Sequence, residues 1–216
     1  MAKCYMCDND STSVEHTPPK SFFPANHRNN LLTVPACKEH NEDTSKDDEY
    51  VRNIMTMSIH NNKTAIDHFF QKSLKSFQRS PALASSVRNS LKEVSEFKPD
   101  AHAFQVERDR FDRTIRKIAY ALFYKEYDVT WERLLAVLTN QLRFSDMSLD
   151  DFGEMSQEIF EDLDDLELKG ENGLVFKYAF FDFGTDPNDK ALFLLFYEGF
   201  PICVIPDKNS DSNSLD

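Results

Sequence analysis

Four potential metal ligands, grouped in two close pairs, constrain the fold of the first 41 residues. Cys4 and Cys7 form a Cys-x2-Cys pair, and Cys37 and His40 form a Cys-x2-His pair after a further 29 residues. A gap of two residues lets one tight turn present both side chains to the same ion, and zinc prefers four such sulfur and nitrogen ligands. The segment is short and polar, so apolar burial alone would not fold it. The pattern predicts a structural Zn2+ at these four residues, rather than free cysteines beside a surface histidine.

A carboxylate and a histidine, Glu15 and His16, lie between the two ligand pairs and precede Thr-Pro-Pro. A histidine can take a proton from water near neutral pH. Glu15 and Asn41, which directly follows the last zinc ligand, offer oxygen atoms of the kind that Mg2+ or Mn2+ accepts. In the alternative interpretation, Glu15 and His16 only form hydrogen bonds within a loop, and Asn41 caps a helix. The residues by themselves leave both interpretations open.

Residues 4–60 resemble the HNH endonucleases, in particular the zinc-stapled variant of their ββα-metal fold. The family pattern has a Cys-x2-Cys pair, an acidic residue and a histidine before a proline, then Asn-Leu, and then a second ligand pair followed by asparagine. This chain has His40 where a cysteine is commoner, and it lacks the glycine-rich loop that often follows the first histidine. The resemblance implies an enzyme that hydrolyses phosphodiester bonds in DNA and leaves 5′-phosphate and 3′-hydroxyl ends.

The resemblance also implies a role for each residue of the motif. His16 would be the general base that activates water for attack on phosphorus, and Glu15 and Asn41 would ligate the catalytic Mg2+ or Mn2+. Asn30 would orient the histidine loop through hydrogen bonds, and Asn29 is the alternative residue for this role. The structural zinc would be a separate site.

Basic residues near the motif are few, and Lys20, Arg28 and Lys46 are the expected weak contacts with nucleic acid. The resemblance implies DNA, ahead of RNA, as the partner. Because basic residues are few, we expect a phage-defence effector that a second protein regulates or targets to its substrate. A homo-oligomer is compatible with this expectation, because a single HNH site cuts one strand at a time. The competing function is a zinc-stapled interaction module that keeps the HNH frame without catalysis.

The charge of the chain is uneven, which matters for a nucleic-acid partner. The net charge is −12, yet residues 146–216 hold 18 acidic and four basic residues. The rest of the chain is close to neutral, so it would not repel a polyanion. The acidic run at residues 161–165 fits a docking surface for a basic partner or an ordinary solvated segment. The basic run at residues 108–117 fits contact with a phosphate backbone or the solvated face of an amphipathic helix.

The sequence has no features of export or membrane insertion. No apolar run approaches the length of a membrane span, and the N-terminal residues have no signal-peptide core. We expect a cytoplasmic protein without membrane contact, in which the grouped cysteines bind metal rather than form disulfides. Cys203 is expected to be a buried thiol in a strand. Four histidines are expected to be surface or packing residues: His27, His60, His68 and His102.

Hydrophobic periodicity predicts an α+β, mainly helical fold. The ββα-metal module, residues 1–60, should pair a strand at 31–34 with residues 11–14 and start a helix near Thr44 or Ser45. Residues 61–216 should contain helices and then a small antiparallel sheet, with helices at 64–77, from Pro81, and at 106–127, 131–142 and 157–166, and strands at 174–181, 192–197 and 202–205. The expected buried side chains of residues 64–77 are Ile66, Phe69, Phe70, Leu74 and Phe77.

Overall fold

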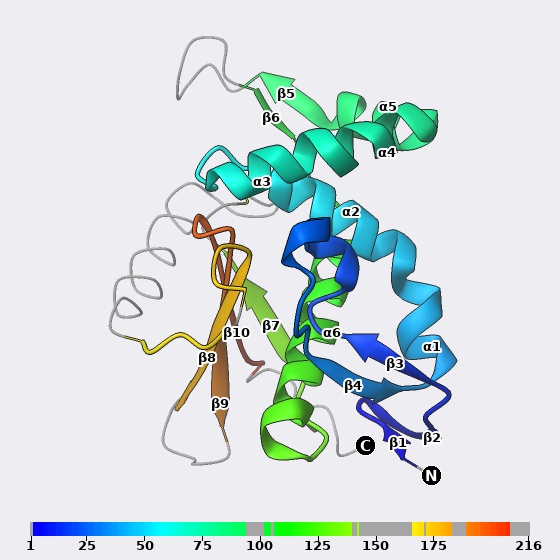
Figure 1. Cartoon of the computed structure of the whole chain (residues 1–216), viewed down its shortest axis with the longest axis vertical. Coiled ribbons are helices and arrows are strands. Elements are labelled where there is room, and N and C mark those ends of the chain that lie inside the picture. The colour runs from blue at the N-terminus through cyan, green and yellow to red at the C-terminus, as the bar shows by residue number, and fades with distance from the viewer. Residues whose placement is uncertain are drawn as a thin grey trace, which may run out of the picture.

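The first four strands form two short antiparallel pairs (Figure 1). The computed structural model describes residues 2–93, 102–104, 106–139, 142, 166–170, 172–182 and 189–207. Strand β1 (Lys3–Cys4) pairs with β2 (Cys7–Asp10), and β3 (Ser13–His16) pairs with β4 (Thr33–Ala36). The second pair confirms the expected strand and its partner, with both shifted by about two residues along the chain.

Helical structure follows β4 directly and completes a strand–strand–helix unit. Helix α1 (Lys38–Asn41) leads through a 3-10 turn into α2 (Ser45–Thr56). The expected start of the helix is therefore confirmed, but the expected capping is wrong. The Thr44 hydroxyl donates a hydrogen bond to the carbonyl of Asn41 and makes no cap to α2. Helix α1 and the 3-10 turn lead into α2 without a break. The backbone amides at the start of α2 therefore follow helical residues, and α2 has no free N-terminus for a side chain to cap.

The next helical stretch has three parts: α3 (Lys63–His68), a π-helical turn, η4 (Phe69–Ser73), and α4 (Leu74–Arg79). Together they cover the expected helix. Helix α5 (Pro81–Ser90) then begins at the expected proline, and a short pair of strands follows it, β5 (Leu91–Glu93) with β6 (His102–Phe104).

The expected buried face of residues 64–77 is wrong. Ile66, Phe70 and Leu74 are exposed, and the buried residues are Ala65, His68, Ser73 and Ser76. The reason is a polar contact with distant parts of the chain. His68 Nδ1 lies 2.8 Å from the hydroxyl of Tyr197, which donates to a backbone carbonyl. Hydrogen bonds of this kind cannot be read from the periodicity of one helix.

Helix α6 (Arg108–Tyr127) is the long amphipathic helix that the sequence predicts, and it ends at Asp128 in the left-handed conformation. In Figure 1, α6 lies between the N-terminal strands and the C-terminal sheet. It contacts α2, β4 and β7. Its buried apolar side chains are Phe111, Ile115, Ile118, Ala119, Ala121 and Leu122.

The C-terminal sheet is antiparallel, with strand order β7–β10–β9–β8. Strands β8 (Phe176–Asp182), β9 (Lys190–Phe196) and β10 (Phe200–Pro206) confirm the three expected strands. The helix expected at residues 131–142 is wrong, because β7 (Leu135–Leu138) is a strand paired with β10. The short apolar run of β7 is compatible with a helix or a strand, and its pairing within the sheet decides between them.

One hydrophobic core joins the N-terminal segment to the C-terminal sheet. Phe22 and Tyr50 lie in the same buried cluster as Ile115 of α6 and Leu194 of β9. A smaller cluster beneath β1 includes Cys4, Tyr5, Val34, Ala36, Cys37 and Ala121. The fold is therefore α+β, as expected, with helices and a small C-terminal antiparallel sheet.

Some predictions fall outside the described residues. The helix at residues 157–166, apart from residue 166, and the acidic run at 161–165 are among them. Within the described part of the chain, none of the helices has the length and apolar character needed to cross a membrane.

Candidate metal centre and the neighbouring site residues

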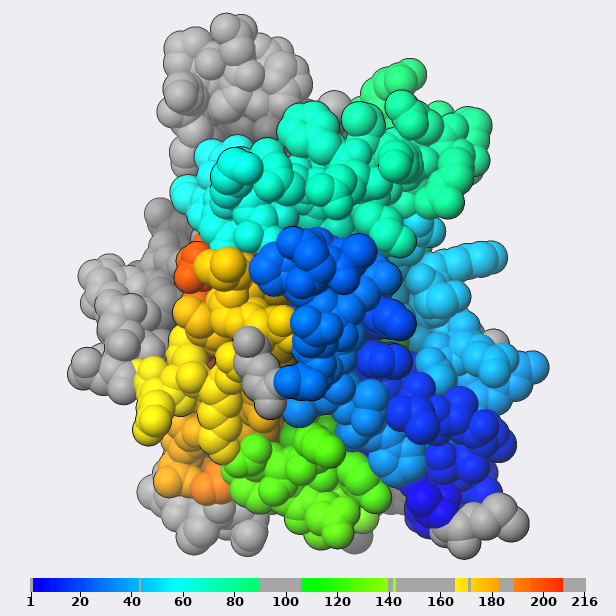
Figure 2. Space-filling view, viewed as in Figure 1, coloured from blue at the N-terminus to red at the C-terminus, as the bar shows by residue number. Residues whose placement is uncertain are grey.

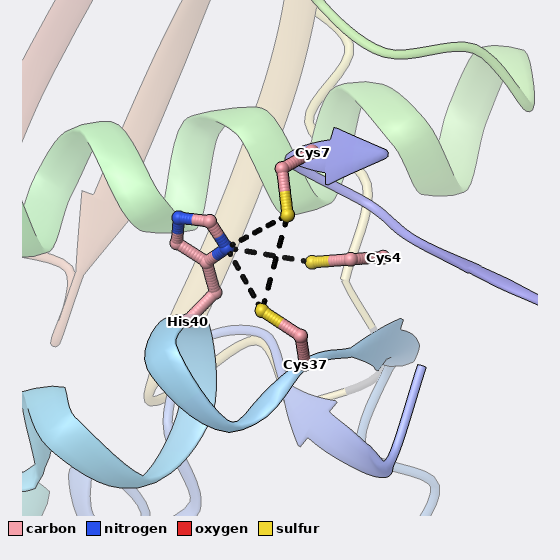
Figure 3. A group of neighbouring side chains, drawn as sticks. All are labelled: Cys4, Cys7, Cys37 and His40. Carbon is pink, nitrogen blue, oxygen red and sulfur yellow. Dashed lines mark hydrogen bonds between the residues drawn. The ribbon is translucent and has the colours of Figure 1, made fainter. Parts of the chain in front are cut away.

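The four expected zinc ligands converge (Figure 3). Cys4 and Cys7 come from the β1–β2 turn, Cys37 immediately precedes α1, and His40 lies in α1. His40 Nδ1 lies 3.5 Å from the sulfurs of both Cys4 and Cys7, and 3.3 Å from the sulfur of Cys37. The sulfurs of Cys7 and Cys37 are 3.9 Å apart. All four ligand atoms lie within 4.8 Å of one another.

These distances match those of a tetrahedral metal site. Bond lengths of about 2.3 Å to sulfur and about 2.0 Å to nitrogen place ligand atoms roughly 3.5 Å apart for sulfur and nitrogen, and roughly 3.8 Å for two sulfurs. The measured separations of 3.3–3.5 Å and 3.9 Å agree with both values. Cys4, Cys7, Cys37 and His40 could therefore bind one metal ion.

The surrounding fold holds the ligands in place. The backbone amide of Tyr5, between the two cysteines of the first pair, donates to the carbonyl of Pro35 in β4 at 2.9 Å. Cys37 stands at the start of α1. Burial acts to raise its pKa, but backbone hydrogen bonds at His40 and Glu39 and the neighbouring thiols outweigh burial, so the pKa of the Cys37 thiol is lowered. A lowered pKa favours the thiolate, which is the form that binds metal.

Glu15 is buried, in contrast to the open cation ligand expected from the sequence. The residue is only 4% exposed, and its carboxylate is turned into the protein. Oε1 of Glu15 lies 3.3 Å from the ammonium of Lys117, which belongs to α6. The same ammonium lies 2.7 Å and 2.9 Å from the two carboxylate oxygens of Asp48, and 2.8 Å from the hydroxyl of Thr44. One lysine therefore ties β3 to the start of α2.

Burial dominates the electrostatics of this group. It raises the pKa of Glu15 to about 7, against the opposing effect of Lys117. Burial likewise raises the pKa of Asp48, again opposed by Lys117. Sequence reasoning missed both partners of Glu15. Asp48 lies in the first turn of α2, 33 residues after Glu15, and the sequence contains no local signal that connects the two. Lys117 is 102 residues from Glu15, and no local signal connects them.

Asn41 contacts β3 through its amide nitrogen, which donates to Ser13 Oγ at 2.9 Å and to the carbonyl of Val14 at 3.3 Å. These bonds fix α1 against the strand. Among the described residues, no hydrogen bond joins Asn41 to Glu15. The structure therefore brings both residues to β3 but does not show them as a pair around one ion.

His16 is the last residue of β3 and is partly exposed, one position beyond the buried Glu15. Burial, with a smaller effect from the positive charge of Lys20, lowers the pKa of His16. A lowered pKa keeps the imidazole neutral at neutral pH, so it is able to accept a proton. Thr17 anchors the chain directly after it, because its hydroxyl donates to the carbonyl of Ile118.

Asn30, the expected orienting residue, is in the left-handed conformation with φ 53°. It lines a pocket that is also lined by Thr17, Pro18 and Tyr178. This places Asn30 beside the segment that follows His16. The carbonyl of its neighbour Asn29 accepts a hydrogen bond from Asn172 at 3.0 Å.

The basic residues fall into two groups. Those of α6 form ion pairs within the protein, since Arg110 and Arg113 bind Asp47, and Arg108 and Arg116 bind Asp112. The four arginines of α6 are thus neither unpaired cations available to a phosphate backbone nor simply the solvated face of a helix. By contrast, three residues that were expected to contact nucleic acid form no ion pair with any described acidic residue. They are Lys20, Arg28 and Lys46.

The remaining cysteine and histidines contribute no ligand to the cluster. Cys203 is buried in β10, and burial raises the pKa of its thiol to about 12, so the expected buried thiol is confirmed. His68 packs in the interior against Tyr197, and His60 is exposed. The side chain of His102 lies outside the described part of the structure.

No family model, curated protein or solved structure matches this chain.

Proposed function

We propose that this chain is an HNH-type endonuclease that hydrolyses phosphodiester bonds in DNA. The observation that carries the proposal is the strand–strand–helix unit at the N-terminus. In this unit His16 ends β3, and the second ligand pair, Cys37 and His40, sits at the start of the helical segment that follows β4. This order and placement support the proposal, because the resemblance implies the same arrangement.

The first component of the proposal is a structural zinc at Cys4, Cys7, Cys37 and His40. Its support is the agreement of the ligand separations with tetrahedral zinc geometry. Four protein ligands leave no open coordination position, so this ion would stabilise the fold rather than activate water. Bound there, it would hold the β1–β2 turn against α1.

The second component is proton transfer by His16. Its imidazole is neutral at neutral pH because its pKa is lowered, and it is accessible at the end of a strand. It would take a proton from a water molecule as that water attacks phosphorus. The products would be a 5′-phosphate and a 3′-hydroxyl. Mg2+ or Mn2+ at Glu15 and Asn41 stays a prediction of the resemblance, and the carboxylate of Glu15, buried against Lys117, does not fit that role.

The third component is a DNA-binding face on η2 (Ala25–His27), with Arg28 after it, and on η4 and α4, which carry Lys72 and Arg79. Lys72 and Arg79 form no ion pair with a described acidic residue. Burial lowers the pKa of Lys72, and so do the nearby positive charges of Arg28, Arg52 and Arg79. Figure 2 shows the surface around residues 20–30 directly beside that of α3 and α4. Cations that repel one another favour a polyanion, although Glu49 offsets part of their charge.

A zinc-stapled interaction module without catalysis is the second candidate function. The burial of Glu15 beneath Lys117 favours it, because a metal-dependent nuclease needs an accessible carboxylate. The two candidates differ in what His16 does, since a neutral and accessible imidazole is necessary only for the nuclease.

Nicking of supercoiled plasmid by the zinc-loaded protein distinguishes these functions. The wild type should nick DNA, and His16→Ala should abolish nicking. His60→Ala is the matched control, because this histidine is exposed and outside the motif. Equal nicking by the wild type and His16→Ala would reject the role of His16. Absence of nicking by a zinc-loaded wild type would favour the interaction module.

A further inference from the structure

The ammonium of Lys117 lies among carboxylate and hydroxyl oxygens, one of which belongs to Glu15, an expected ligand of the catalytic cation. It lies within 2.7–3.3 Å of four oxygens, from Glu15, Thr44 and both carboxylate positions of Asp48. Carboxylate and hydroxyl oxygens are also the ligands of hard divalent cations. The oxygens therefore surround a positive charge that the chain itself supplies from α6.

This group is closed to solvent. The side chain of Lys117 is 4% exposed, that of Glu15 is 5% exposed and that of Asp48 is 10% exposed. Two buried carboxylates without a cation would be strongly destabilising, so one positive charge is necessary at this point. Apart from the Cys3His centre, the described residues contain no group of three or more Cys, His, Asp or Glu side chains that converge on an ion.

We infer that Lys117 takes the place of the divalent cation that the HNH pattern implies, and that this chain does not bind Mg2+ or Mn2+ at Glu15. A tethered ammonium supplies the charge but has no open coordination position for water or phosphate. Activation of water would then depend on His16, which lies on the accessible side of β3. The catalytic meaning of this inference rests on the proposed nuclease function, whereas its prediction for metal binding does not.

Binding of Mn2+ to the zinc-loaded full chain tests the inference. The loss of the electron paramagnetic resonance signal of free Mn2+ reports binding without any need for activity. The wild type and Glu15→Gln should show the same weak binding. Lys117→Ala removes the ammonium and leaves space beside both carboxylates, so it should bind Mn2+ about tenfold more tightly or better.

Two further variants make the comparison specific. Lys117→Ala combined with Glu15→Gln should lose the added affinity, because one of the two carboxylates is gone. Lys125→Ala is the matched control, since it removes an exposed lysine from the same helix. Far-ultraviolet circular dichroism and zinc content establish that each variant is folded.

Two outcomes would overturn the inference. One is Mn2+ binding by the wild type that Glu15→Gln weakens, and the other is a folded Lys117→Ala without added affinity. If Lys117→Ala does not fold, the wild type and Glu15→Gln decide the matter: equal weak binding supports the inference and unequal binding overturns it. Nicking assays report on the nuclease separately, so a chain that fails to nick DNA can still pass this metal test.

Discussion

The ammonium of Lys117 lies 2.7 Å from Oδ1 of Asp48, and this contact joins α6 to α2 across 69 residues of sequence. Both side chains are almost fully buried. Glu15 shares the same ammonium, so the end of the β3 strand, the first turn of α2 and the middle of α6 meet at one charge. The N-terminal unit is therefore attached to the rest of the protein by an electrostatic contact as well as by the core.

Replacement of Lys117 by methionine should destabilise the protein strongly. The variant keeps much of the side-chain volume but leaves two carboxylates without their partner, and breaking a buried ion pair in this way costs about 3–5 kcal/mol. Urea unfolding followed by circular dichroism measures the loss. Lys125→Met, at an exposed site of the same helix, should change stability by less than about 0.5 kcal/mol. Equal effects of the two variants would contradict the importance of the buried contact.

The pKa of Glu15 predicts how stability changes with pH. Burial raises this pKa from 4.5 to about 7, so the folded protein holds a proton that the unfolded chain releases. The favourable contribution of the protonated group is complete below pH 4.5 and is lost as the pH rises to about 7. This difference between the pKa values of the unfolded and folded states corresponds to about 3 kcal/mol of unfolding free energy.

The comparison that isolates this effect is between wild type and Glu15→Gln, whose amide does not titrate. The unfolding free energy of the wild type should fall relative to that of the variant between pH 4.5 and about 7. Asp48 has a pKa raised in the same direction and contributes a decline of the same sign. A constant difference between the two proteins across this range would show that the pKa of Glu15 is not raised.

Zinc content should follow the four ligands and no other cysteine. The wild type should contain one zinc per chain, and Cys37→Ser should lose it and unfold at lower urea, because zinc binding contributes directly to folding in such segments. Cys203→Ala is the matched control, since it removes a buried cysteine from β10, away from the cluster. Elemental analysis measures the metal. Retention of zinc by Cys37→Ser would remove this residue from the ligand set.

Much of the local structure could be predicted from the sequence, because its determinants are local. A gap of two residues between ligands fixes a tight turn, and a 20-residue amphipathic pattern predicts a helix such as α6. The strand pair β3–β4 and the three C-terminal strands followed from the same kind of pattern. The four potential metal ligands could be predicted for this reason, since each pair lies within four residues of sequence.

The predictions that failed depended on distant partners. The segment of β7 fits a helix or a strand by itself, and its pairing with β10, over 60 residues later, decides the outcome. The buried face of α3 and α4 is polar because Tyr197 supplies a hydrogen-bond partner for His68, and Arg52 supplies one for Ser76. The environment of Glu15 depends on Lys117, 102 residues away. In each case tertiary contact overrides a local preference.

Binding of DNA should depend on the cations of η4 and α4 rather than on those of α6. We predict that Lys72→Gln combined with Arg79→Gln weakens binding of a fluorescein-labelled duplex, because these side chains form no ion pair with a described acidic residue. Each lost phosphate contact should reduce the slope of log affinity against log salt concentration by about 1. Fluorescence anisotropy at several salt concentrations measures both quantities.

The matched control for this prediction is Arg88→Gln combined with Lys125→Gln, which removes the same charge from exposed sites on α5 and α6. A general effect of net charge would weaken binding equally in both double variants. If DNA binds to this face specifically, the control should keep the wild-type slope of log affinity against log salt concentration. The double variant of Lys72 and Arg79 should have a slope smaller by about 2. His16→Ala should bind DNA as the wild type does, because the imidazole is neutral and acts in proton transfer rather than in attraction of phosphate.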